Sequence, residues 1–310
     1  MNDRRSLYNM QRLKPLNDFI FKKLFGEKDD EIILLSFLNA ILSKTYTEPL
    51  TEIIIIENKE LTKEMLEDKT GRIDVRAKTQ NGEQIDVEVQ LTDQNNMDKR
   101  TLFYWGKLFL EGIKQGEDYT TLKKVITINL VNFNYLETKD YHSSFHLWED
   151  SEKDYLLSDV MEIHFIELPK FRKNTLKNGE EGNKELNRWL SFLQQDISEE
   201  RLEEIIKMDP AIKMAEEKLE KLSHDPDTIA LYRAREDSAH ERANLISTGI
   251  RRGIEEGIQQ GIQQGIQQGI HQRNIELAIN LLDILDDETI SQKTGLSVEE
   301  VKKLRMNNEV

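Results

Sequence analysis

The chain has 310 residues, of which 37% are hydrophobic and 33% charged, and its net charge is −15. It holds no run of about 18 apolar residues that could cross a bilayer, so the composition excludes an integral membrane protein. The lack of cysteine excludes disulfides, thiolate zinc sites and cysteine nucleophiles. Because the first residues also lack the apolar segment of a secretory signal, we expect a cytoplasmic protein.

The charge is distributed unevenly along the chain. A strongly negative protein is poorly suited to coating nucleic acid, because affinity for DNA depends largely on Lys and Arg. Basic residues are nevertheless frequent between 12 and 107, whereas 180–220 is dense in acids. A locally basic site on an acidic protein is therefore compatible with the composition.

The first two thirds of the chain alternate between helical and strand patterns. Residues 16–42 predict two buried helices on either side of the polar segment GEKDD. The β-branched run at 51–59 predicts a strand, and apolar residues at helical spacing predict a helix over 93–114. A buried strand is predicted at 123–133, and the alternating run at 161–171 predicts another strand that ends at Pro169.

A β-hairpin is predicted between the first strand and the helix. Two runs of alternating apolar and polar residues, GRIDVRAKT at 71–79 and EQIDVEVQL at 83–91, are separated by a turn that contains Asn81 and Gly82. Since side chains alternate along a strand, Asp86, Glu88 and Gln90 should share one face of the second run.

The second half of the chain is predicted to be helical. Charged amphipathic helices are predicted at 181–195, 198–207 and 211–222. We expect a catalytic-type domain at 1–195, a charged helical region at 196–248, a Gly-Ile repeat at 249–273 and a small helical tail at 274–310.

The Gly-Ile repeat places these two residues at every fourth position from Gly249 to Ile270. A four-residue step overshoots one helical turn by about 40°, so the Ile row winds around a straight helix. Each Gly costs a helix about 1 kcal/mol relative to Ala. We therefore expect self-association through this repeat, with a flexible low-complexity spacer as the alternative.

The tail resembles a minimal helix-turn-helix. Its last helix should begin after Ser297, with Glu300 placed for a capping box. Because Glu299 and Glu300 at the start of this helix suit phosphate contacts poorly, we expect a structural or partner-binding role.

The hairpin carries the candidate chemistry. If its strands pair, Asp74 can lie beside Glu88, and two such carboxylates suit Mg²⁺ or Mn²⁺. A bound cation of this kind could activate water against a phosphodiester. The alternative is that these acids are the solvated face of an amphipathic hairpin.

Several segments together resemble the PD-(D/E)XK nuclease superfamily, and within it the recombination-promoting nuclease (Rpn) family of transposase-like proteins. The resembling stretches are LKPLNDFIFKKLF at 13–25, GRIDVRA at 71–77, IDVEVQ at 85–90, KRTLFYWGKLF at 99–109 and FIELPKF at 165–171. The resemblance implies an α/β, restriction-endonuclease-like core, in which a mixed sheet is flanked by helices, with a helical C-terminal extension. It also implies a Mg²⁺-dependent endonuclease that acts on double-stranded DNA in recombination or in defence against foreign DNA.

The family motif assigns its acids to Asp74 and Glu88. Gln90 stands where most members of the superfamily have Lys, and it can offer hydrogen bonds but no positive charge. Asp18, on the first helix, could add a metal ligand or could only favour the helix dipole.

Residues Lys22, Lys23 and Arg100 could contact the DNA backbone, although helical lysines are often only solvated. A second interpretation keeps the fold without the chemistry: an oligomeric binding or regulatory module, which Gln90 and the net charge favour. His142 and His146 have a spacing that could bind zinc only on a helix, but YHSSFHLWED at 141–150 predicts a loop or a short strand, so a zinc site is not expected there. His164 lies in the strand predicted within 161–171.

Overall fold

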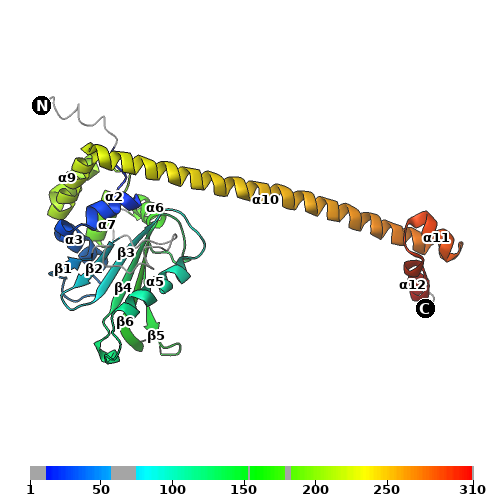
Figure 1. The fold of residues 1–310 in the computed structure, drawn as a ribbon, viewed down its shortest axis with the longest axis horizontal. Coiled ribbons are helices and arrows are strands. Elements are labelled where there is room, and N and C mark those ends of the chain that lie inside the picture. Colours follow the sequence, from blue (N-terminus) through cyan, green and yellow to red (C-terminus); the bar gives the residue numbers. More distant parts are fainter. Residues whose placement is uncertain (1–11, 57–74, 153, 179–182, 309–310) are drawn as a thin grey trace. The chain divides into compact units, whose positions relative to one another are not determined.

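The computed structural model describes residues 12–56, 75–152, 154–178 and 183–308 (Figure 1). The chain divides into two compact units, Met1–Arg235 and Glu236–Val310. The first unit therefore extends beyond the boundary expected at residue 195.

A six-stranded mixed sheet forms the centre of the first unit, with the strand order β1-β2-β3-β4-β6-β5. Strands β3, β4 and β6 run parallel to one another, whereas β1, β2 and β5 are antiparallel to their neighbours. The expected sheet type is thus confirmed. The strands are β1 (Ile53–Ile55), β2 (Val75–Thr79), β3 (Gln84–Gln90), β4 (Val125–Val131), β5 (His142–Trp148) and β6 (Leu156–Glu167).

The predicted hairpin is formed by β2 and β3, which pair Val75 with Val87 and Lys78 with Gln84. Gly82 in the turn has a φ of +83°, a conformation that side-chain-bearing residues rarely adopt. The turn chemistry in the sequence therefore matches the observed chain reversal.

One face of the sheet is covered by the predicted N-terminal helices α2 (Asp18–Phe25) and α3 (Glu31–Ile41), together with α7 (Lys184–Phe192). The 3-10 helix η1 (Lys28–Asp30) links α2 to α3. At the centre of this layer is an aromatic cluster whose ring centroids lie 4.6–6.3 Å apart. Its members are Phe21, Phe25, Phe37 and Trp189.

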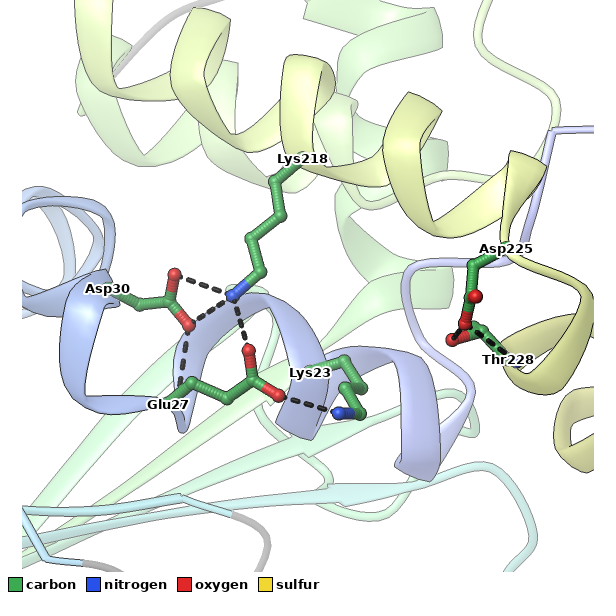
Figure 2. A network of polar contacts seen from close by, with 6 residues as sticks. All are labelled: Lys23, Glu27, Asp30, Lys218, Asp225 and Thr228. Atoms are coloured by element: carbon green, nitrogen blue, oxygen red, sulfur yellow. Dashed lines mark hydrogen bonds and ion pairs between the residues drawn. The ribbon is translucent and has the colours of Figure 1, made fainter.

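Helices α8 (Glu199–Met208) and α9 (Pro210–His224) complete this layer, because Leu202, Ile205 and Leu219 are buried in the same core. A network of ion pairs and hydrogen bonds connects α9 to η1 (Figure 2). In it, the ammonium of Lys218 lies 2.6 Å from Asp30 and 2.9 Å from Glu27. Helices α8 and α9, which follow residue 195, are therefore part of the first unit.

The opposite face of the sheet is covered by α5 (Met97–Glu111), the helix predicted over 93–114. Tyr104 and Leu108 pack on Val125 of β4, and Met97 packs among residues of β4 and β6. The hairpin and β4 are consequently covered on both faces.

At the end of the sheet, the segment at 141–150, for which a loop or a short strand is expected, contains the edge strand β5. Strand β6 differs from the prediction in its bounds, because it begins at Leu156, before the run at 161–171. β6 ends at Glu167, and Pro169 lies in the first turn of α6 (Leu168–Asn178). Pro fits there because the first turn needs no backbone N–H donor.

The second unit is helical. The Gly-Ile repeat lies within the long helix α10 (Pro226–Leu281), which is followed by α11 (Asp287–Thr294) and α12 (Val298–Asn308). Residues of all three helices form a small core. The predicted capping box is confirmed, because Ser297 accepts from the backbone of Glu300 and the Glu300 carboxylate accepts from that of Ser297.

Among the helices of the described residues, none combines the length and the hydropathy needed to span a bilayer.

Candidate nuclease site

The polar face of β3 is buried. Asp86 is 1% exposed and Glu88 is 3% exposed, because α5 lies over this side of the sheet. For these two acids the alternative of a solvated hairpin face is wrong. Burying carboxylates is costly unless a cation or hydrogen bonds compensate them, so this arrangement requires a specific cause.

Arg100 supplies part of the compensation for Glu88. Its Nε lies 3.3 Å from Oε2 of Glu88, and its guanidinium carbon lies 5.5 Å from the centroid of the Tyr104 ring. Arg100 and Tyr104 are one helical turn apart on α5, as their spacing predicts. Helix α5 therefore directs a cation at the carboxylate rather than only covering it with apolar groups.

The second carboxylate oxygen of Glu88 is the unusual atom of the site. Oε1 is buried and has no hydrogen-bond partner among the described residues. Burial raises the pKa of the Glu88 carboxyl, and the charge and hydrogen bond of Arg100 oppose that rise without cancelling it. A buried carboxylate oxygen without a donor is a group that a hard divalent cation can satisfy.

Asp74, the other expected ligand, lies outside the described residues. The chain resumes at the next residue, Val75, whose partner across the hairpin is Val87, the neighbour of Glu88. Gln90 shares the face of Glu88 at the end of β3, opposite Val131, and is half-buried.

The other residues predicted to belong to the site, Asp18, Lys22 and Lys23, lie on α2. Asp18 is an exposed residue whose carboxylate pairs with Arg235 at 2.9 Å. Lys23 donates to Glu27 at 2.7 Å within the network of Figure 2, and Lys22 is half-buried. In the parts of the chain that the structure describes, no group of three or more His, Asp or Glu side chains is arranged to hold a metal.

Polar residues of β4 also face this site, and the sequence analysis did not identify them. Thr127 and Asn129 are the cross-strand partners of Asp86 and Glu88. Asn129 accepts from the hydroxyl of Thr101 on α5, whereas the buried hydroxyl of Thr127 has no partner within the described residues. Their signal in the sequence is the interruption of the apolar strand VITINLV by polar residues at alternate positions.

Beside these residues, Arg76 of β2 pairs with Glu111 of α5 at 2.8 Å and also donates to Gln84. The polar face of β2, β3 and β4 is thus a buried layer of charged and hydrogen-bonding groups beneath α5. Such a layer can hold a cation and fix its ligands, which a purely apolar interface could not do.

Comparison with known proteins identifies one family. A family model described as PD-(D/E)XK nuclease family transposase matches residues 15–249, which is well over half of the chain. No curated protein and no solved structure matches. The match agrees with the family resemblance of the sequence and with the mixed sheet flanked by helices.

Proposed function

Because the chain belongs to the PD-(D/E)XK nuclease family transposases, we propose that it is a metal-dependent endonuclease that hydrolyses phosphodiester bonds of double-stranded DNA. We further propose that this endonuclease cuts DNA with little sequence specificity and acts in recombination or in defence against foreign DNA. The observation that carries the proposal is the buried Oε1 of Glu88, which has no donor among the described residues.

In this proposal Glu88 and Asp74 hold Mg²⁺, with Mn²⁺ as a substitute, and Asp18 is a candidate additional ligand. Support for Glu88 comes from its burial, its place on a central strand and the oxygen left open by Arg100. A divalent cation would polarise the scissile phosphate and make water a stronger acid. Arg100 would fix the orientation of the Glu88 carboxylate through Oε2.

Gln90 and the basic residues have secondary roles in the proposal. Gln90 lies on the face of Glu88 and can orient water or phosphate by hydrogen bonds, without charge. We propose backbone contacts for Lys22, Lys23 and Arg100. For Lys23, such a contact would require the side chain to exchange its present partner, Glu27, for a phosphate. Arg100 would reach a phosphate through its Nη groups while its Nε remains with Glu88.

A plasmid-nicking assay with Mg²⁺ tests the proposal. We expect Asp74→Ala and Glu88→Ala to lower the cutting rate at least about 100-fold, because each removes a ligand that the chemistry needs. Glu52→Gln, which removes the charge of an exposed acid next to β1, is the control and should cut normally. Circular dichroism establishes that each variant is folded. Equal cutting by all four proteins would contradict the assignment.

The second candidate is an oligomeric binding or regulatory module without catalysis. The observation in its favour is the row of exposed Ile side chains on α10, together with Gln90. Calorimetric titration with Mn²⁺ separates the two candidates, because a module without catalysis needs no cation at Glu88. Heat that is present in the wild type and absent in Glu88→Ala would favour the nuclease.

A further inference from the structure

A pocket of about 350 Å³ lies under the C-terminal end of α3, between that helix and strands β5 and β6. The register places it on the face of the sheet opposite Glu88. Glu88, Asn129 and Phe165 are successive cross-strand partners and share one face, so the alternate residues of β6, Glu162 and His164, point to the other. The pocket is therefore separate from the candidate nuclease site.

The floor of the pocket is built around a buried carboxylate. Glu162 receives the ammonium of Lys124 at 2.6 Å, Nε2 of His164 at 2.9 Å and the hydroxyl of Thr45. Nε2 of His146 lies 3.5 Å from the same carboxylate. Burial raises the pKa of Glu162, but the hydrogen bonds from His164, Lys124 and Thr45 more than offset this and hold the pKa well below its usual range.

These contacts determine what the pocket offers to a ligand. Thr45 and His164 both contact Oε1 of Glu162, whereas Oε2 forms the ion pair with Lys124 and has no further hydrogen bond among the described residues. The carboxylate therefore holds its cationic and hydrogen-bonding neighbours beside the pocket. The ammonium of Lys124 carries three N–H groups, and besides its ion pair with Glu162 it lies 5.8 Å from the centroid of the Tyr46 ring. A buried carboxylate that contacts a lysine and two histidines can hold these side chains in fixed orientations along the wall of a pocket.

The rim of the pocket adds a second charge and an aromatic surface. Lys44, after the end of α3, is near enough for its charge to contribute to the low pKa of His142, about 4, whose main cause is burial. Trp148 lines the other side and is 49% exposed. Asp159 is the other acid of the lining, and its side chain, like that of Lys44, is exposed to solvent.

We propose that this pocket binds a nucleoside phosphate, with the phosphate at Lys44 and Lys124 and the base against Trp148. The volume is at the small end of ligand sites, which suits a mononucleotide. An ammonium pair recognises the phosphate, and an exposed indole stacks on any base. The same chemistry is offered by a free mononucleotide and by the phosphorylated end of a DNA strand.

Calorimetry on the full chain in EDTA tests this binding independently of any nuclease activity. The probes are deoxyadenosine monophosphate, deoxyadenosine and inorganic phosphate. We expect the monophosphate to bind more tightly than either of the other two, because only it contacts both ends of the pocket. Lys44→Gln and Trp148→Ala should each weaken its binding about tenfold. Both residues are exposed, so circular dichroism should remain unchanged.

The control is Lys213→Gln, which removes another exposed charge, on α9 and outside the pocket lining. Equal affinity for the nucleoside or for phosphate alone, no binding of the monophosphate, or binding that neither pocket variant weakens would each overturn the proposal. A 5′-phosphorylated oligonucleotide that binds more tightly than its unphosphorylated form identifies a strand end as the source. Equal binding of the two oligonucleotides, with the monophosphate bound, identifies the free nucleotide.

Discussion

Glu88 combines a position typical of a surface strand residue with nearly complete burial. In the sequence it alternates with apolar residues, as an exposed acid of an amphipathic hairpin would. In the structure α5 covers it, Arg100 engages Oε2, and Oε1 is left without a donor among the described residues. The energetic cost of that burial is itself a reason to expect a cation there.

At the same scale, His142 gives a prediction for stability. The unfolded chain binds its proton at about pH 6.5, whereas burial, with the charges of His164 and Lys44, lowers the pKa in the folded chain to about 4. Between these values protons favour the unfolded chain. On acidification from about pH 7.5 to about pH 5, we therefore expect this residue to lower the free energy of unfolding by about 2 kcal/mol.

Urea unfolding of wild type and His142→Gln at both pH values measures this effect. The variant should lose less stability on acidification, because Gln binds no proton in either state. The control is His224→Gln, at an exposed residue, which should leave the pH dependence unchanged. The same pH dependence in His142→Gln as in the wild type would refute the prediction.

At the scale of elements, α10 presents its repeat to solvent. The six Ile residues of the repeat, from Ile250 to Ile270, are 56–59% exposed. A Cβ added to any of its six glycines, from Gly249 to Gly269, would meet nothing within 4 Å. Within a single chain, the glycines therefore cost helix stability without a packing benefit. Close packing of a second copy against the glycines would supply that benefit, in line with the self-association expected from the repeat.

We predict that replacing Gly257, Gly261 and Gly265 by Ala lowers the oligomeric mass in solution, because added methyl groups block a close approach of helices. Each substitution also favours the isolated helix by about 1 kcal/mol, so helicity should not fall. Light scattering measures the mass. Replacing Gln259, Gln263 and Gln267 by Ala controls for helix propensity and should leave the mass unchanged. An unaltered mass in the glycine variant would exclude packing through the glycines.

At the scale of the whole molecule, the first unit depends on helices beyond the sheet. Leu202, Ile205, Ile212 and Leu219 of α8 and α9 are buried in its main core. Each such side chain contributes about 1.5–3 kcal/mol, and together they are comparable with the total stability of a domain. We therefore expect the stability of the first unit to depend on α8 and α9.

We expect a chain of residues 1–235 to unfold cooperatively on heating and a chain of residues 1–195 not to do so. The shorter chain loses those four side chains and also the contacts of Lys218 with Glu27 and Asp30. Circular dichroism melting curves of both chains make the comparison. Cooperative unfolding of the shorter chain at the temperature of the longer one would show that α8 and α9 are dispensable.

The sequence predicted most elements well. The helices of 16–42, the hairpin around Gly82 and α5 were identified because their periodicity and turn chemistry are local properties. β5 was ambiguous because an edge strand shows weak alternation, and its residues are mostly exposed or half-buried. The burial of α8 and α9 against the first unit does not follow from the sequence, because their charged surfaces hide how much of their other face is buried.

The sequence by itself determined the family-like order of elements, the shared face of Asp86, Glu88 and Gln90, and the helical tail, because each follows from spacing along the chain. Only the tertiary structure decided that this face is buried, that Arg100 meets Glu88, and that Lys124 and His164 gather around Glu162. The physical reason is that burial and charge pairing depend on segments distant in sequence, and no local pattern specifies which of them will meet.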